Sequence, residues 1–495
     1  MTPATVRALV DAAAATTPHA VYARATESDT VLTYAELQRG CRRVAAALAA
    51  QGVKPGDTVS LVMPNGLATL QWLLGAMHAG CAVNPVNLLS QADAMRYVLE
   101  HSDCRLVLAS ADWAPRVREL MPALPLLTVD PDRIELPESE LDTPPPDAEA
   151  MALLMYTSGT TGRPKGVMLT QGNLAANARS IAAEHALGPA DRVLGVLPLY
   201  HINAFAVTML APLASGGSVA MAPRFSVQRF WDQAIDSACT WINVVPTIIA
   251  FLLEAPPPPR AAITRLRFCR SASAALPPEH HRAFEAAFGI GIIETMGLTE
   301  TVAPSFSNPL DTSLRKVGSV GRASGCEARV VDAQLQQVPD GTTGEITIRG
   351  PQVMRGYYKN PEATAAAFTH DGWLRTGDLG HRDGDGFFFV TGRIKELIIK
   401  GGENIAPREI DEALLQHPSV LDAAAVGIPD PRYGQEILAC IVLRDGSVAD
   451  EAELRAFCEQ RLGRYKTPRE FRFVSELPRG PSGKVQRLKL AEGAR

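Results

Sequence analysis

The segment Thr157–Gly166, which reads TSGTTGRPKG, has the composition of a phosphate-binding loop. Its glycines free the backbone to turn amide groups toward a ligand, its hydroxyl side chains add donors, and Lys165 adds a positive charge. The spacing does not fit the Walker A pattern, and turn chemistry alone would explain only the glycines. We therefore predict that a polyphosphate binds here, with nucleotide contacts from Thr157, Ser158, Gly159, Thr160, Thr161, Gly162 and Lys165.

Four further motifs follow along the chain: ETMGLTE at 294–300, WLRTGDL at 373–379, GRIKELIIKGGENIAP at 392–407 and PSGKV at 481–485. Together with the phosphate loop, and in this order, they resemble the signature of the AMP-forming adenylating (ANL) superfamily. That superfamily contains acyl-CoA synthetases, carrier-protein adenylation domains and beetle luciferases. The resemblance implies an α/β fold with a large N-terminal domain of stacked α/β subdomains, residues 1–393. A small mobile α+β C-terminal domain, residues 394–495, would carry the catalytic lysine.

The resemblance also assigns residues to the nucleotide. Thr299 would face the phosphates, and Glu300 would bind Mg²⁺ through a hard carboxylate oxygen. Met296 stands where the family usually has an aromatic residue that stacks on adenine, and its polarizable thioether can replace part of that contact. Asp378 would accept hydrogen bonds from the ribose hydroxyls. Arg393 would contact the ribose or a phosphate.

The C-terminal motifs imply two half-reactions at one site. In the first, a carboxylate attacks the α-phosphate of Mg-ATP to give acyl-AMP and pyrophosphate, with Lys484 bridging the reacting oxygens. In the second, the small domain turns about Lys395, and a thiol, that of coenzyme A, displaces AMP. Lys400, Gly401 and Gly402 would then meet the thiol arm of coenzyme A. We therefore expect an ATP-dependent carboxylic acid–CoA ligase that uses Mg²⁺.

The acid is less well defined by the sequence. His201, in PLYHINA, sits where related synthetases place a gate between the carboxylate pocket and the nucleotide. The residues that map to the acyl pocket are Asn203, Ala204, Val245, Ala272, Thr295, Gly297, Val302 and Ala303. This lining is small and uncharged, which favours a neutral small-to-medium acid. Several segments, among them LRFCRSASAAL, resemble the oxalate-activating branch, but that branch carries histidines at the positions of Asn203 and Ala303.

Three other functions stay open at this point. An enzyme that loads a carrier-protein phosphopantetheine would share the same motifs, because both thiols enter by the same arm. A luciferase-like oxygenase also begins by adenylation. Met296 is the only feature that favours a nucleotide-binding protein without activity. Gln171 stands where many relatives have histidine, and the sequence does not explain this difference.

The elements that must position these motifs alternate along the chain. Short buried strands are predicted at 59–63, 106–109 and 153–157, and helices at 35–50 and 67–79. This alternation favours α/β layers with parallel sheets. Beyond Arg393 we expect short strands and two amphipathic helices, at 407–417 and 451–462.

Composition excludes several classes of partner. With 48 basic and 53 acidic residues the net charge is −5, which argues against binding to nucleic acid or to anionic membranes. The most apolar region, 204–222, is interrupted by proline, glycine and serine, so no membrane span is expected. The eight cysteines are scattered singly, which indicates a reduced, cytoplasmic protein. The oligomeric state stays open, with a homodimer as one option.

Overall fold

The computed structural model describes residues 4–157, 163–479 and 485–492, and the chain divides into two compact units. The first unit comprises Met1–Glu327 and Ile348–Leu374, and the second comprises Ala328–Thr347 and Arg375–Arg495. The expected α/β class, with a large N-terminal and a smaller C-terminal domain, is confirmed. The predicted boundary after residue 393 falls inside the second unit, and as a boundary of movement it stays a prediction.

The first unit contains a seven-stranded sheet in the order β18-β8-β7-β4-β3-β5-β6. The strands from β7 to β6 are parallel, whereas β8 and β18 run antiparallel to their neighbours. Helices α4 (Ala92–His101) and α5 (Ala114–Leu120) cover one face and share a separate apolar cluster with it. The strand bounds are β3 Thr58–Val62, β4 Ala82–Pro85, β5 Leu106–Ala109, β6 Leu126–Thr128, β7 Met151–Thr157, β8 Lys165–Thr170 and β18 Gly356–Tyr357.

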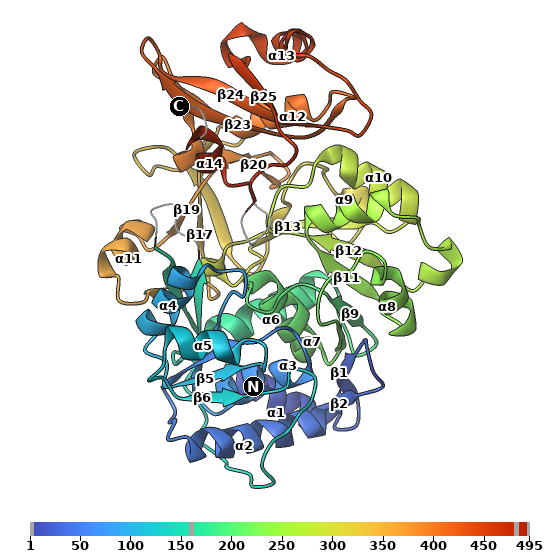
Figure 1. Cartoon of the computed structure of the whole chain (residues 1–495), viewed down its shortest axis with the longest axis vertical. Coiled ribbons are helices and arrows are strands. Elements are labelled where there is room, and N and C mark those ends of the chain that lie inside the picture. Colours follow the sequence, from blue (N-terminus) through green and yellow to red (C-terminus); the bar gives the residue numbers. More distant parts are fainter. Residues whose placement is uncertain (1–3, 158–162, 480–484, 493–495) are drawn as a thin grey trace. The chain divides into compact units, whose positions relative to one another are not determined.

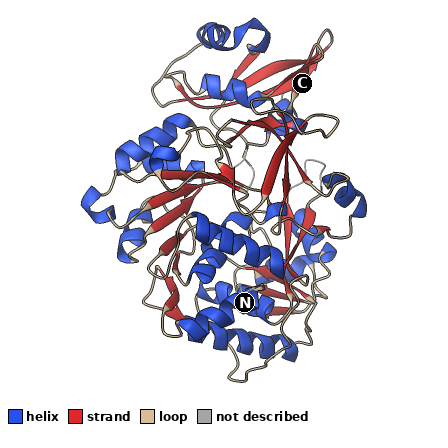
Figure 2. Cartoon of the chain, turned by 180° about the vertical axis from the view of Figure 1, so that it is seen from behind, coloured by secondary structure: helices blue, strands red, loops and turns tan. Residues whose placement is uncertain are grey.

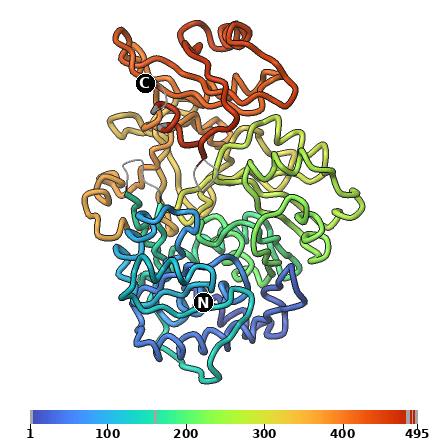
Figure 3. Tube along the Cα trace, in the orientation of Figure 1, coloured from blue at the N-terminus to red at the C-terminus, as the bar shows by residue number. Residues whose placement is uncertain are grey.

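A nine-stranded sheet in the order β15-β14-β13-β12-β11-β9-β10-β1-β2 forms the other half of this unit. The N-terminal hairpin β1–β2 pairs with β10, so the blue start of the chain lies beside green strands from residues near 200 (Figure 3). Helices α8 (Phe230–Asp236), α9 (Pro246–Glu254) and α10 (Pro278–Phe288) lie beside its parallel strands (Figure 1). The strand bounds are β1 Val21–Ala25, β2 Val31–Thr33, β9 Arg192–Gly195, β10 Ser218–Met221, β11 Trp241–Val244, β12 Phe268–Ser271, β13 Ile292–Met296, β14 Phe306–Ser307 and β15 Arg322–Ala323.

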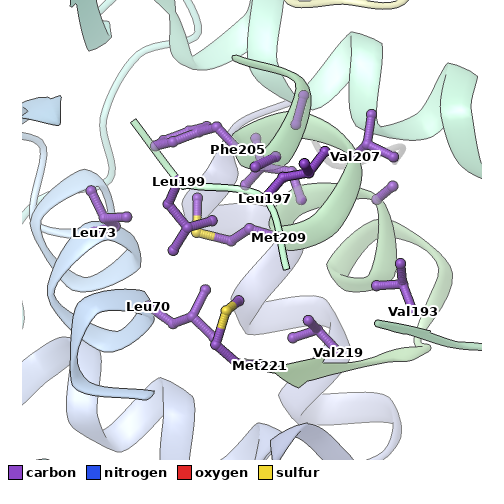
Figure 4. Packing of buried hydrophobic residues seen from close by; sticks show 14 of the residues in the cluster. Leu70, Leu73, Val193, Leu197, Leu199, Phe205, Val207, Met209, Val219 and Met221 are labelled. Carbon is purple, nitrogen blue, oxygen red and sulfur yellow. The ribbon is translucent and has the colours of Figure 1, made fainter. Parts of the chain in front are cut away.

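A layer of helices fills the space between the two sheets and forms one apolar core with them (Figure 2). Every residue of α3 (Leu67–His78) is buried, as expected of a helix that is apolar all round. Its Leu70 and Leu73 lie near Met209 of η1 and Met221 of β10 (Figure 4). The other helices of this layer are α1 Val6–Thr16, α2 Tyr34–Ala50, α6 Gln171–Glu184, α7 Ala211–Ser215 and the π-helix η1 Ala204–Leu210.

The apolar stretch 204–222 is used as core. It forms η1, then α7, and then β10 after a left-handed Gly216 at the end of α7. Among the residues that the structure describes, no helix is long and apolar enough to cross a membrane. The seven-residue π-helix is a rare element, and such wide turns occur mostly at functional sites.

The second unit is built on two sheets. The four-stranded sheet has the order β16-β17-β19-β20, and in the five-stranded sheet β22, β21, β24 and β23 follow one another while β25 pairs with β24. Alternate side chains of β23 and β24 enter two clusters, one with α12 and α13 and one that includes Leu490 of α14. The bounds are β16 Glu327–Val331, β17 Gly344–Arg349, β19 Leu374–Arg382, β20 Phe388–Arg393, β21 Ile398–Lys400, β22 Glu403–Ile405, β23 Val420–Asp430, β24 Gly434–Leu443, β25 Glu470–Phe473, α12 Pro407–Leu414, α13 Glu451–Lys466 and α14 Arg487–Glu492.

Most of the expected elements are present with small shifts at their ends. Helix α2 begins at Tyr34 because Thr33 and Glu36 form a capping box. The predicted short strands beyond Arg393 are wrong for β23 and β24, which make a long hairpin with 11 and 10 residues. Helix α13 runs past the predicted end, although Gly463 leaves the helical conformation within it. The remaining elements are α11 Pro361–Ala367 and the 3₁₀ turns η2 Arg260–Ile263, η3 Thr299–Thr301, η4 Thr312–Leu314 and η5 Ile394–Glu396.

Candidate active site

The two strands that flank the phosphate loop hold its ends together. Thr157, at the end of β7, is paired directly with Lys165, at the start of β8. The antiparallel pairing therefore places the lysine beside the residue at which the loop begins, as a phosphate site requires. The predicted contacts Ser158, Gly159, Thr160, Thr161 and Gly162 lie outside the described residues.

Tyr357 connects the phosphate-loop lysine to the predicted magnesium ligand. Its strand, β18, pairs antiparallel with β8, which places the ring 4.8 Å from the Lys165 ammonium. The Tyr357 hydroxyl donates a hydrogen bond of 2.8 Å to Glu300 Oε1. Burial and the neighbouring carboxylate raise the pKa of Tyr357, so the hydroxyl keeps its proton and remains a donor. The structure thus brings Lys165 and Glu300 to one aromatic ring, which no sequence motif indicates.

Glu300 is held by its backbone as well as by its side chain. It lies in η3 with Thr299, directly after β13, and its carbonyl oxygen accepts a 2.7 Å hydrogen bond from the backbone N–H of Met354. No group of three acidic, histidine or cysteine side chains suited to a metal occurs among the described residues. Mg²⁺ in nucleotide sites is usually bound by one or two carboxylates together with phosphate oxygens, so a single oriented carboxylate fits it.

The segment after β13 folds back tightly on itself. A Cβ on Gly297 would lie 2.6 Å from the Ala303 Cα, so only glycine allows this approach. Val302 and Ala303 have left-handed φ values of 60° and 32°. For a β-branched residue such as Val302 that conformation is an outlier, and strained backbone is concentrated at functional sites. Met296 ends β13, so Met296, Gly297, Val302 and Ala303 are brought together.

The other residues assigned to the acyl pocket stand at one edge of the nine-stranded sheet. Strands β11, β12 and β13 are parallel neighbours, and Val245 and Ala272 directly follow β11 and β12. Thr295 is buried within β13. In open α/β sheets, ligands bind at this carboxyl edge of the strands. Asn203 and Ala204 stand at the start of η1, shortly after His201, whose ring lies 4.8 Å from that of Tyr200.

Asn203 is hydrogen-bonded to a group of buried polar side chains. Its Nδ2 donates to Ser273 Oγ over 3.2 Å, and its Oδ1 accepts from Arg270 Nη1 over 2.7 Å. Arg270 Nη1 also donates to Asn243 Oδ1 over 2.9 Å. Arg270 lies in β12 and is fully buried. The sequence does not single it out, because LRFCRS contains two arginines and nothing local marks the second as the buried one.

In the second unit, strand pairing brings together the two residues that are predicted to contact the ribose. Asp378 of β19 is the direct antiparallel partner of Arg393 of β20, and the Arg393 Nε lies 2.8 Å from Asp378 Oδ1. The Asp378 carboxylate is almost completely buried, whereas Arg393 is partly exposed. The strand pairing therefore holds these two side chains together. Lys395 follows within η5.

The expected coenzyme A segment is a two-residue hairpin turn between β21 and β22. Gly401 and Gly402 both have positive φ, at 56° and 88°, and turns of this kind favour glycine at both positions. Lys400 is buried, and its ammonium lies 3.0 Å from Glu436 and donates to the carbonyl of Tyr465. Its charge is compensated inside the unit, and a contact to coenzyme A stays a prediction.

Lys484 lies outside the described residues, but the segment that follows it is firmly attached. Arg487, three residues later, forms ion pairs with Asp411 of α12 and with Glu396 of η5. It also donates a 2.8 Å hydrogen bond to the carbonyl of Ala425. These contacts fix residues 485–490 to the same unit that contains Lys395.

Gln171, which the sequence left unexplained, has a structural role. It is fully buried, and its Oε1 accepts from the backbone N–H of Val6 over 3.0 Å. Its Nε2 donates to the carbonyl of Met77 over 2.8 Å. One side chain thus joins the starts of α6 and α1 to the end of α3, and both of its polar atoms are satisfied.

Comparison with known proteins extends over both units. Residues 10–358 match the family model described as AMP-binding enzyme, and residues 409–484 match the AMP-binding enzyme C-terminal domain. A sulfoacetate–CoA ligase from Cupriavidus necator is 57% identical over 99% of this chain and 98% of its own length. An oxalate–CoA ligase from Arabidopsis thaliana is 37% identical over 93% of each chain. The crystal structure of ATP-bound MatB from Rhodopseudomonas palustris superposes with a TM-score of 0.93, with 30% identity over 99% of each chain.

Proposed function

Since the chain belongs to the family of AMP-binding enzymes and is an ATP-dependent acid–CoA ligase, we propose how its residues divide the two half-reactions and which acid they act on. The observation that carries the proposal is the contact of Tyr357 with both Lys165 and Glu300. A cation, a hydroxyl donor and a carboxylate that can hold a metal thus converge at the base of the phosphate loop. That combination suits the stabilisation of a leaving pyrophosphate.

In the first half-reaction, a carboxylate oxygen of the acid attacks the α-phosphorus of ATP, and the bond to pyrophosphate breaks. No general base is needed, because a carboxylate is already ionised at neutral pH. Lys165 neutralises phosphate charge, and Thr299 faces the phosphates. Glu300 would hold Mg²⁺, which when bound supplies electrostatic stabilisation of the phosphates. Lys484 bridges the attacking carboxylate and the α-phosphate.

The nucleotide and the acid are held by separate groups. The paired Asp378 and Arg393 hold the ribose, and Met296 lies against adenine. His201 separates the carboxylate pocket from the nucleotide.

In the second half-reaction, residues 394–495 turn about Lys395 and bring the Gly401–Gly402 turn to the acyl-AMP. The thiolate of coenzyme A attacks the acyl carbon, the bond to AMP breaks, and AMP leaves as its anion. The side-chain-free turn lets the thiol arm approach the backbone. The relatives named above as CoA ligases favour free coenzyme A over a carrier protein.

For the acid, we propose sulfoacetate as the first candidate, because the Cupriavidus necator relative is 57% identical over nearly the whole chain. A neutral small-to-medium acid, which the uncharged pocket residues favour, is the alternative. All eight cysteines are free, and seven of them are buried, which supports a reducing compartment such as the cytoplasm.

Acid-dependent exchange of pyrophosphate into ATP, measured across a panel of acids, tests the proposal and ranks the substrates. Lys484→Ala should abolish the exchange, yet leave thioester formation from pre-made acyl-AMP within a few-fold of the native rate. Lys489→Ala, which removes an exposed lysine of α14, serves as the matched control and should change neither rate. Equal loss of both half-reactions in Lys484→Ala would contradict the division of roles.

A further inference from the structure

Arg270 is a buried cation in the nine-stranded sheet, and no residue that the structure describes supplies a counter-charge to it. Its strand, β12, lies between β11 and β13, and the residue is 0% exposed. No carboxylate among the described residues forms an ion pair with it. Burial lowers the pKa of Arg270 to about 9, so the guanidinium is still charged at neutral pH. A buried charge is normally paired, since an unpaired one is costly to the folded state.

The hydrogen bonds of Arg270 leave one edge of the guanidinium unused. Nη1 donates to the side-chain oxygens of Asn203 and Asn243, and these are neutral acceptors. Nε and Nη2 are buried and have no hydrogen-bond partner among the described residues. These two nitrogens form the side of the guanidinium that can present two parallel N–H groups. That fork matches the oxygens of a carboxylate or a similar oxyanion.

Arg270 lies close to the residues that are assigned to the acyl pocket. It is the penultimate residue of β12, and Ala272, assigned to the acyl pocket, follows one residue after the strand ends. Its partner Asn203, also assigned to that pocket, is hydrogen-bonded to Ser273 in the same loop. Ser273 has a left-handed φ of 76°, which turns this loop over the strand end. The unpaired cation is therefore one hydrogen bond away from the predicted acyl pocket.

Neutral neighbours explain why this charge is available. Asn203 and Asn243 orient the guanidinium from one side, and Asn243 Nδ2 is in turn 3.3 Å from Asn203 Oδ1 and from Thr208 Oγ1 of η1. Because these acceptors carry no net charge, they fix the plane of Arg270 without neutralising it. An anionic group that binds its free edge would supply both the missing hydrogen bonds and the missing charge.

We propose that Arg270 is the specificity-determining residue of this ligase and selects short acids that carry a second anionic group, a sulfonate or a carboxylate, at the end distant from the activated carboxylate. The inference rests on the proposed function, and it deepens it by naming the substrate class and the receptor group. Asn203 and Asn243 act as positioning residues for Arg270. The uncharged acyl lining then excludes longer or bulkier acids, while the guanidinium binds the second anionic group.

The test compares acids of similar shape that differ in distal charge. Sulfoacetate and malonate carry a second anion, whereas methylsulfonylacetate has a methyl group in place of one sulfonate oxygen and is neutral at that end. Acid-dependent pyrophosphate exchange gives kcat/KM for each. The native enzyme should have a higher kcat/KM with at least one dianionic acid than with methylsulfonylacetate. The ratio of kcat/KM for sulfoacetate to that for malonate shows whether the distal group is a sulfonate or a carboxylate.

Arg270→Met should lower kcat/KM for the preferred dianionic acid by about 10²-fold or more, as expected when one partner of a buried charged pair is removed. Its activity with methylsulfonylacetate should stay within a few-fold. Arg270→Lys keeps the charge but loses the fork, and should give an intermediate loss. Arg265→Met, which removes an exposed arginine five residues earlier, is the matched control and should keep the native preference.

The outcomes separate the inference from the proposed function. Exchange without preference for a dianionic acid, or an equal loss with all acids in both Arg270 variants, would overturn the inference and leave acid activation intact. No exchange with any acid would overturn the proposed function, and the inference with it. The preference for a distal charge is measured with the native enzyme, so the test remains decisive even if Arg270→Met does not fold.

Discussion

Replacing Tyr357 by phenylalanine isolates one hydrogen bond in the proposed phosphate and metal site. The change removes the hydroxyl that donates to Glu300 Oε1 over 2.8 Å, and keeps the ring that lies 4.8 Å from Lys165. A hydrogen bond to a charged group contributes about 1.5–3 kcal/mol, and each 1.4 kcal/mol is a factor of ten. We therefore expect kcat/KM for pyrophosphate exchange to fall by about 10- to 100-fold.

The dependence on magnesium identifies the cause. If the hydroxyl orients the carboxylate for the metal, the Tyr357→Phe variant should need a higher Mg²⁺ concentration for half-maximal exchange. Tyr358→Phe is the matched control, because the neighbouring tyrosine donates instead to the exposed Asp103. An exchange rate within two-fold of native at every Mg²⁺ concentration would refute the idea that Tyr357 positions Glu300.

Two further predictions concern stability against acid and the second half-reaction. Burial acts to raise the pKa of Asp11, but hydrogen bonds such as that from His78 outweigh it and lower the pKa from 3.8 to about 2. This carboxylate therefore stabilises the fold above pH ~4, and its contribution is lost as the pH falls toward 2. The free energy of unfolding, measured by urea titration from pH 5 to 2, should therefore fall less in Asp11→Asn than in the native protein or in the exposed-site control Asp29→Asn, and equal slopes would contradict this. Gly401→Ala places a Cβ at a φ of 56° and should slow thioester formation from pre-made acyl-AMP by about 10-fold while sparing pyrophosphate exchange. Gly446→Ala, at a φ of 74° with no atom within 4 Å of the added Cβ, should spare both rates, so an equal loss in the two variants would count against a role for the turn.

The motifs predicted those parts of the site that depend on short stretches of chain. Thr157 and Lys165 are brought together by a local hairpin, and Gly401 and Gly402 form a turn that their own sequence requires. Asp378 and Arg393 lie on adjacent strands that a short connection joins. In each case the spacing in the sequence nearly determines the distance in space, so the sequence alone predicts that these residues lie close together.

The groups that the sequence did not reveal depend on contacts between distant segments. Tyr357 reaches Glu300 only because β18 adds to the edge of β8, nearly two hundred residues earlier. The significance of Arg270 depends on Asn203 and Asn243, which come from other elements, and on the absence of a paired carboxylate among the described residues. Lys400, which we expect to meet coenzyme A, is buried beside Glu436, a partner from another strand. Such pairings follow from tertiary packing, and no local pattern encodes them.

The attachment of Arg487 has a mechanical consequence. Its ion pairs with Asp411 and Glu396 join the segment that begins at Val485 to α12 and to η5, the turn that contains Lys395. If the chain turns about Lys395 as we propose, the segment from Val485 onward would therefore move together with α12. The 485–490 segment need not refold for this to happen. The ion pairs of Arg487 would thus carry the segment next to Lys484 along with the proposed rotation.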